Sequence, residues 1–248
     1  MKKYLLLLAA LFLGGAVLAQ DSKPSAQAIA AKIQADEKLL TDWPQLGRYR
    51  SENEALSAPV KGEQRVVFIG DSITDIWGRQ SGVFFPGKPY INRGIIGQVT
   101  GQMLVRFRPD VIDLKPSVVL ILGGTNDIAN NTGSDALHLI EGNLASMAEL
   151  ARANGIKVVL ASITPVNDYV HPGMSAGRPT QKILALNAWI KYYAQRNHLI
   201  YLDYYSSLLD ANHALKSEYS KDGLHPDAAG FAVMSPLAQR AIDQALAE

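Results

Sequence analysis

Five short apolar runs, separated by longer helical stretches, constrain this chain more than any other feature. The runs are rich in β-branched and aromatic residues, which is typical of strands buried on both faces. They cover residues 65–69, 90–92, 117–122, 156–162 and 199–203. Helical patterns cover residues 99–113, 134–154, 180–197 and 227–247. This alternation predicts an α/β fold, in which helices cover both faces of a parallel sheet of about five strands.

Composition narrows the classes of function. The 248-residue chain is 48% hydrophobic and 19% charged, which is enough for a sizeable core. It contains no cysteine, and this excludes disulfide scaffolds, iron–sulfur sites and thiol nucleophiles. Its formal charge of +1 argues against a protein that binds polyanions, so we expect no nucleic-acid partner.

Residues 1–19 have the pattern of a secretory signal peptide. Lys2 and Lys3 precede an apolar run that is shorter than the roughly 20 residues of a membrane span, and small residues lead up to Ala19. We therefore predict cleavage after Ala19 and a secreted or periplasmic location in a bacterium. After cleavage we expect no stable insertion in a membrane. Because no cysteine follows, attachment as a lipoprotein is not expected.

The rest of the chain divides into two predicted parts. Residues 20–60 form an N-terminal helical extension, whose polar helical pattern is interrupted at Pro44 and Gly47 and so predicts two helices. The character of the sequence changes after Pro59 and Gly62, and we assign the main α/β domain to residues 61–248. Within that domain, residues 165–179 are expected to form a loop.

Residues that could take part in catalysis follow three of the predicted strands and precede the last predicted helix. Ser72 comes after the first strand, Gly97 after the second and Asn126 after the third, while Asp222 and His225 precede the last helix. The carboxyl ends of parallel strands meet at one edge of a sheet. A hydroxyl, a base, an acid that orients the base and N–H donors are the groups that acyl transfer needs. Taken alone, each residue could instead have a purely structural role, as a helix cap, a turn glycine or a loop residue.

Together these motifs make the chain resemble the SGNH hydrolases of the GDSL esterase/lipase family. The four family blocks are matched by Gly70-Asp71-Ser72, Gly97, Asn126 and Asp222-x-x-His225. The resemblance implies a three-layer α/β/α flavodoxin-like fold without a metal or an organic cofactor. It also implies that Ser72 is the nucleophile, His225 the base and Asp222 its orienting partner. The oxyanion hole would comprise the backbone N–H groups of Ser72 and Gly97 and the side chain of Asn126.

The chain departs from the family pattern at two positions. Ile73 replaces the usual Leu, and Gln98 stands where many relatives carry Asp, which bears on the support of the Ser72 turn. Trp77 and the pair at 84–85 are expected in the core, with a place in the substrate pocket as the alternative. The sequence does not predict an oligomeric state.

The activity we expect is hydrolysis of short-chain carboxylic esters through an acyl-enzyme, because the chain has no long apolar lid segment. Export favours acetyl esters, including those on carbohydrates, so the partner is a small-molecule or carbohydrate ester. The same residues would serve an acyltransferase to sugar hydroxyls, a lysophospholipase or a thioesterase. A non-catalytic carbohydrate-binding descendant would not need them all.

Two other enzyme classes fit the sequence less well. An α/β-hydrolase requires a Gly-x-Ser-x-Gly elbow, which the chain lacks. A metal phosphoesterase could use Asp71, Asp127, Asp222 and His225 as ligands, but Gly97 and Asn126 would then have no role.

Overall fold

The computed structural model describes residues 25–130 and 136–248, which belong to two compact units. The first unit ends at Thr41, and its described part contains helix α1 (Ala26–Thr41). The second runs from Asp42 to Glu248 and contains every strand. Residues 42–60, which the sequence analysis groups with a helical extension, are therefore in the same unit as the sheet. The predicted signal peptide and residues 134–135 lie outside the described residues.

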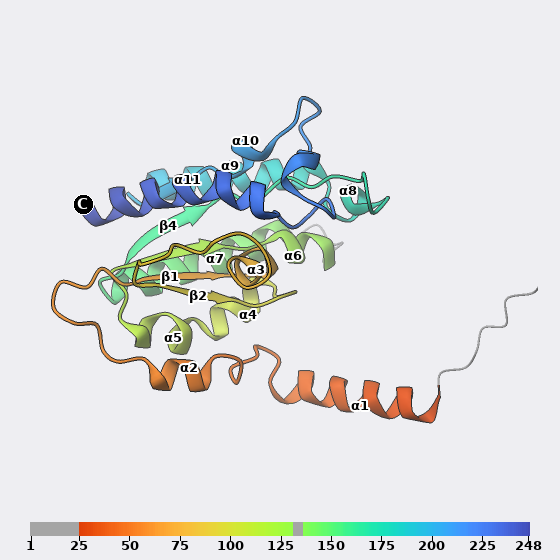
Figure 1. Ribbon diagram of the computed structural model, residues 1–248, viewed down its shortest axis with the longest axis horizontal. Helices are drawn as coiled ribbons and strands as arrows, with labels where there is room; N and C mark the ends of the chain where they lie inside the picture. The colour runs from red at the N-terminus through yellow and green to blue at the C-terminus, as the bar shows by residue number, and fades with distance from the viewer. Residues whose placement is uncertain (1–24, 131–135) are drawn as a thin grey trace, which may run out of the picture. The chain divides into compact units, whose positions relative to one another are not determined.

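The second unit follows the predicted alternation of strands and helices (Figure 1). Its strands are β1 (Val66–Gly70), β2 (Tyr90–Gly94), β3 (Val118–Leu122), β4 (Lys157–Ala161) and β5 (Ile200–Leu202). Its helices are α2 (Arg50–Ala55), α3 (Ser72–Ile76), α4 (Thr100–Val105), α5 (Phe107–Asp110), α6 (Thr125–Asn130), α7 (Ala136–Ala153), α8 (Met174–Gly177), α9 (Thr180–Arg196), α10 (Tyr205–Leu208) and α11 (Ala228–Ala247). Two 3₁₀ helices, η1 (Ile112–Leu114) and η2 (Ser217–Tyr219), complete the described elements.

All five strands are parallel and lie in the order β2-β1-β3-β4-β5. The chain starts in the sheet at β1, adds β2 on one side and then crosses to β3 on the other. In doubly wound sheets of this kind, ligands bind beyond the carboxyl ends of the strands where the order reverses. The fold places that point between β1 and β3, the strands that precede Ser72 and Asn126.

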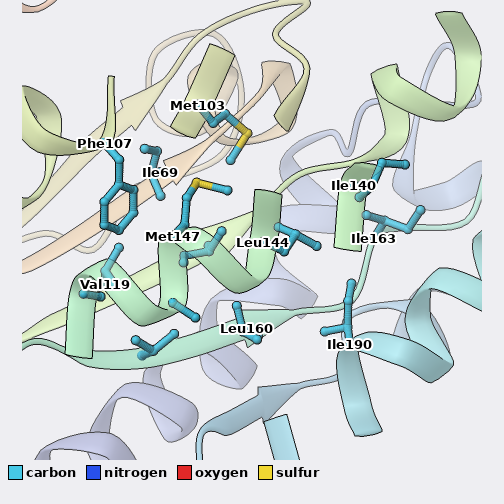
Figure 2. Close-up of a cluster of buried hydrophobic side chains, with 14 of the residues drawn as sticks. Ile69, Met103, Phe107, Val119, Ile140, Leu144, Met147, Leu160, Ile163 and Ile190 are labelled. Carbon is cyan, nitrogen blue, oxygen red and sulfur yellow. The ribbon is translucent and has the colours of Figure 1, made fainter. Parts of the chain in front are cut away.

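The side chains of each strand contribute to two separate hydrophobic cores, because successive residues of a strand point to opposite faces of the sheet. Val67 and Ile69 face the core that contains α4, α7 and α9, and Figure 2 shows Leu144 and Met147 of α7 in this cluster. Val66 and Phe68 face the core that contains α3, α10 and α11. The sheet is thus covered on both faces, which confirms the predicted three-layer α/β/α fold.

The helix expected over residues 99–113 is three shorter pieces, so that prediction is wrong in detail. The chain forms α4, then α5, then η1, with breaks at Arg106 and Val111. Pro109 explains the first break, because a proline ring clashes with the carbonyl group four residues earlier, here that of Val105. The predicted loop at residues 165–179 is largely irregular and contains only the short helix α8.

Candidate active site

Ser72 is the first residue of α3 and lies directly beyond the carboxyl end of β1. Asp71 caps this helix, since its side chain accepts the N–H of Ile73 at 3.0 Å. The turn requires Gly70, because a Cβ at that position would lie 2.7 Å from the carbonyl oxygen of Leu122. Strand, turn and helix therefore hold Ser72 at the edge of the sheet where ligands bind.

The structure joins Ser72, His225 and Asp222 in one hydrogen-bonded line. Nε2 of His225 is 2.9 Å from Oγ of Ser72, and Nδ1 of His225 is 2.6 Å from Oδ2 of Asp222. An ionised carboxylate can only accept hydrogen bonds, so Nδ1 donates to Asp222 and Nε2 is free to accept from the hydroxyl. This arrangement suits removal of the Ser72 proton by the imidazole.

Asp222 is held as an anion. Burial acts to raise its pKa, but hydrogen bonds from the ring and the backbone N–H of His225 and from the N–H of Leu224 lower the pKa of Asp222 to about 2. Its Oδ1 accepts the backbone N–H of Leu224 at 2.9 Å and that of His225 at 2.8 Å. The carboxylate is therefore available to orient the His225 ring across the ordinary pH range.

Gly97 lies in the loop that follows β2 and has a φ of +77°, a conformation that favours glycine. The preceding residue, Ile96, donates its N–H to Oδ2 of Asp75 at 3.1 Å, which ties the loop to helix α3. Asn126, the second residue of α6, donates its amide to the carbonyl oxygen of Gln98 at 3.0 Å. The structure thus holds Asn126 against the residue that follows Gly97.

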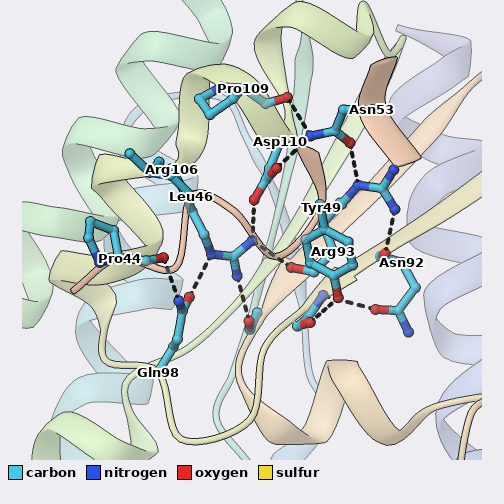
Figure 3. Close-up of polar contacts among 12 residues, drawn as sticks. Pro44, Leu46, Tyr49, Asn53, Asn92, Arg93, Gln98, Arg106, Pro109 and Asp110 are labelled. Atoms are coloured by element: carbon cyan, nitrogen blue, oxygen red, sulfur yellow. Dashed lines mark hydrogen bonds and ion pairs between the residues drawn. The ribbon is translucent and has the colours of Figure 1, made fainter. Parts of the chain in front are cut away.

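A buried cation supports both the Ser72 turn and the Gly97 loop (Figure 3). Arg106 is fully buried and donates to the carbonyl oxygens of Gly70 at 2.9 Å and of Arg93 at 2.8 Å. It also donates to the side-chain oxygen of Gln98 at 2.5 Å and pairs with Asp110 at 3.0 Å. The role of Arg106 is not predicted from the sequence, because the Gly70 carbonyl group that it binds lies 36 residues away.

Residues 42–60 reach the same loops. The carbonyl oxygen of Pro44 accepts from the Gln98 amide at 2.8 Å. Tyr49, which is fully buried (Figure 3), donates its hydroxyl proton to the carbonyl oxygen of Gly94. The same hydroxyl accepts from Arg79 at 2.7 Å. Burial raises the pKa of Tyr49, against the opposing effect of Arg79, so the hydroxyl stays protonated. Residues 42–60, the part of the predicted extension that shares a unit with the sheet, therefore support the candidate site.

A pocket of about 830 Å³ opens beside Ser72. His225 and Asp222 also line it. Its other lining residues include the apolar Ile76, Ile96, Pro226, Ala228 and Ala229 and the polar Gln80, Ser81, Lys221 and Asp227. Trp77, by contrast, is only 2% exposed and stacks on Phe231 in the core, as the core interpretation predicts.

The four residues considered as metal ligands have other partners. Asp127 accepts the backbone N–H of Thr100 at 3.0 Å, Asp222 holds His225, and Asp71 caps α3. Over residues 25–130 and 136–248, no group of three or more histidine and acidic side chains is arranged to hold a metal ion. None of the helices in these ranges is long and apolar enough to cross a bilayer.

Solved structures of bacterial proteins share this architecture. A Bacteroides fragilis protein assigned to the acylhydrolases is 47% identical, with a TM-score of 0.77 over 83% of this chain and 99% of the other. A GDSL-like lipase from Bacteroides thetaiotaomicron is 46% identical, with a TM-score of 0.75 over 82% of this chain and 98% of the other.

One sequence relative matches over a much shorter stretch of the chain. An uncharacterized lipoprotein of Bacillus subtilis, YqeF, is 37% identical over 79 residues. The match spans 31% of this chain and 32% of the lipoprotein, about a third of its length.

The family profile covers the site from end to end. The profile of the GDSL-like lipase/acylhydrolase family matches residues 68–233, a range that includes Ser72, Gly97, Asn126, Asp222 and His225. The individual roles of these residues remain predictions. The chain belongs to the GDSL-like lipase/acylhydrolase family, as the resemblance implies, and is a carboxylic ester hydrolase of that family.

Proposed function

We propose that this chain is an exported serine esterase that hydrolyses short-chain carboxylic esters, foremost acetyl esters, including those on carbohydrates. The observation that carries the proposal is the hydrogen-bonded line from Ser72 through His225 to Asp222, with distances of 2.9 Å and 2.6 Å. In such a line, the hydroxyl proton passes to the imidazole while the carboxylate stabilises the charge that forms there.

In the first half of the reaction, Oγ of Ser72 attacks the ester carbonyl carbon and its proton moves to Nε2 of His225. The carbonyl oxygen becomes an oxyanion, which accepts hydrogen bonds from the backbone N–H groups of Ser72 and Gly97 and from the Asn126 amide. The C–O bond to the alcohol then breaks. His225 returns the proton to the departing alkoxide, which leaves an acyl-enzyme on Ser72.

In the second half, water takes the place of the alcohol. His225 removes a proton from the water as it attacks the acyl carbon, and the same three donors hold the second oxyanion. Collapse of this intermediate releases the carboxylic acid and returns the proton to Ser72. Asp222 stays ionised throughout and keeps the imidazole in the tautomer that each step needs.

The lining of the pocket supports a small acyl group and a hydroxyl-rich alcohol. Its apolar lining comes from Ile76, Ile96, Pro226, Ala228 and Ala229, which can surround a short acyl chain. Gln80, Lys221 and Asp227 supply donors and acceptors suited to sugar hydroxyls. This mixture favours an acetylated carbohydrate over a lipid.

The test is hydrolysis of a p-nitrophenyl ester series from acetate to palmitate. We expect the highest kcat/KM with acetate or butyrate, and loss of nearly all turnover in Ser72→Ala. Ser81→Ala is the matched control, since Ser81 lines the same pocket but lies outside the hydrogen-bonded line, and it should retain activity. Preference for palmitate would contradict the short-chain substrate, and full activity in Ser72→Ala would overturn the mechanism.

A sugar acceptor separates hydrolysis from acyl transfer. With acetyl ester and a monosaccharide together, a hydrolase releases mainly acetate. Formation of acetylated sugar in excess of acetate would instead favour the transferase alternative.

Export is a separate part of the proposal and rests on the pattern of residues 1–19. Expression of the full chain in a Gram-negative bacterium should release the protein into the periplasm, with Gln20 as its first residue. Retention in the cytoplasm with an uncut N-terminus would contradict this part and leave the catalytic proposal intact.

A further inference from the structure

Arg178 reaches the candidate oxyanion hole from a segment that the sequence analysis treats only as a loop. It follows α8 directly and is half-buried. Its Nε donates to Oγ1 of Thr125 at 3.1 Å, and its Nη2 donates to Oδ1 of Asn126 at 3.4 Å. One guanidinium therefore contacts two consecutive side chains at the start of α6.

The Asn126 amide is consequently held at both ends. Its oxygen accepts from Arg178, and its nitrogen donates to the carbonyl oxygen of Gln98 at 3.0 Å. A flipped amide would turn its NH₂ toward the guanidinium and its oxygen toward the Gln98 carbonyl group, and both hydrogen bonds would be lost. The amide has two N–H donors, so one remains for a ligand once Gln98 is satisfied.

The charge of Arg178 has no close counterion in the part of the chain that the structure describes. No carboxylate there lies within ion-pair distance of its guanidinium. Burial lowers the pKa of Arg178, and the more distant carboxylate of Asp71 opposes that change. Oδ2 of Asp71 is itself buried and has no hydrogen-bond partner among residues 25–130 and 136–248. A positive charge beside the site is thus left incompletely neutralised in the free enzyme.

We propose that Arg178 is a positioning residue of the oxyanion hole, which holds the Asn126 amide with its remaining N–H directed at the reacting carbonyl oxygen and polarises that N–H. This inference rests on the proposed role of Asn126 as an oxyanion donor. A donor to the amide oxygen strengthens the hydrogen bond that the amide N–H makes, because linked hydrogen bonds polarise one another. The ester in the ground state carries no full charge, whereas the tetrahedral intermediate does. The benefit therefore appears in kcat rather than in KM.

The test measures kcat and KM on p-nitrophenyl acetate for three variants. Arg178→Met removes the charge and the donors but keeps the length of the side chain, and it should lower kcat about tenfold with KM nearly unchanged. Arg178→Lys keeps the charge but has a single donor nitrogen in place of the guanidinium fork, so it should recover part of the loss. Arg196→Met is the control, because Arg196 is exposed at the end of α9, and its kcat should equal that of the wild type.

A double-mutant cycle shows whether Arg178 acts through Asn126. Asn126→Ala should lower kcat by about 10²–10³. In that background, Arg178→Met should lower kcat by less than about twofold, since the group it positions is gone. A further tenfold loss there would overturn the inference, because Arg178 would then act independently of Asn126. Thermal melting of each variant identifies any loss that comes from unfolding, and the cycle is repeated with Arg178→Lys if Arg178→Met does not fold.

The outcomes separate this inference from the proposed function. If Arg178→Met has wild-type kcat while Asn126→Ala loses activity, the inference is wrong and the esterase mechanism stands. If Ser72→Ala and Asn126→Ala both keep wild-type turnover, the proposed function itself is wrong.

Discussion

Arg106 and Gln98 share a buried hydrogen bond of 2.5 Å between the guanidinium Nε and the side-chain oxygen of the glutamine. Both residues are fully excluded from solvent. The same guanidinium donates to the carbonyl oxygen of Gly70, so one cation joins the Ser72 turn to the Gly97 loop. Asp110, 3.0 Å away, supplies the negative charge. The neutral side chain of Gln98 therefore serves as an acceptor for Arg106, and Asp110 balances the charge.

Gln98→Met should destabilise the fold by about 1–3 kcal/mol, because it leaves a buried donor of Arg106 without an acceptor. It also removes the bond from the Gln98 amide to the Pro44 carbonyl oxygen. Urea unfolding monitored by circular dichroism measures the change. Gln195→Met, at an exposed position on α9, should stay within about 0.5 kcal/mol of the wild type. Equal stability of the two variants would mean that the Arg106–Gln98 bond contributes nothing.

Asp222→Asn should lower kcat by about 10³–10⁴ while the protein stays folded. An asparagine NH₂ facing Nδ1 of His225 favours the tautomer with the proton on Nε2, which can no longer accept the proton of Ser72. Asp203→Asn is the matched control. Asp203 lies outside the pocket beside Ser72 and accepts the backbone N–H of Ser206 at 2.9 Å, a role that asparagine fills equally well. Comparable losses in both variants would point to a general charge effect instead.

Gly94→Ala should destabilise the fold by about 1–3 kcal/mol. A Cβ at this position would overlap the backbone nitrogen of Asp75, where the end of β2 packs against α3. Backbone cannot move aside as a flexible side chain can. Gly142→Ala has the opposite expectation, since nothing lies within 4 Å of its Cβ and alanine favours a helix over glycine by about 0.5–1 kcal/mol. Chemical unfolding of the two variants tests both signs together, and stabilisation by Gly94→Ala would contradict the close approach.

The parts of the fold that the sequence predicts are those encoded locally. Buried strands are continuous apolar runs, and the residues that follow them, such as Ser72 and Asn126, are placed at the sheet edge by the parallel arrangement alone. Asp222 and His225 are three residues apart, so their contact needs only one turn. Pro109 was an available signal for the break in the 99–113 helix, since proline interrupts the hydrogen bonding of a helix interior.

The supporting contacts could not be predicted, because they depend on tertiary structure. Tyr49 lies between two arginines in a polar segment, and nothing in that pattern indicates that it is fully buried. Its partner Gly94 is 45 residues away. Arg178 lies in an irregular loop, where a basic residue is most often solvated, and it contacts Asn126 across 52 residues of sequence. Polar side chains carry no periodic signal for such contacts.

Asp71 has an unusual electrostatic environment beside Ser72. It is 1% exposed, and only one of its oxygens accepts a hydrogen bond among the described residues. Burial raises the pKa of Asp71 from its ordinary 3.8 to about 6, against the opposing hydrogen bond from Ile73. Between about pH 4 and pH 6 the folded chain therefore binds a proton that the unfolded chain does not. The contribution of Asp71 to the unfolding free energy therefore falls as the pH rises through this window, because the folded state must then carry a charged carboxylate in a buried position.

Asp71→Asn should remove the contribution of Asp71 to the pH dependence of the unfolding free energy. The asparagine keeps an oxygen that can accept the Ile73 N–H. The drop in unfolding free energy between pH 4 and pH 7 should be smaller in the variant than in the wild type, by an amount on the order of 1–3 kcal/mol. Only the pH dependence is compared, so a constant effect of the substitution cancels. Urea unfolding at several pH values measures it, with Asp113→Asn, an exposed position, as the control that keeps the wild-type pH dependence. Parallel curves for Asp71→Asn and the wild type would show that Asp71 binds its proton equally well in the folded and unfolded chains.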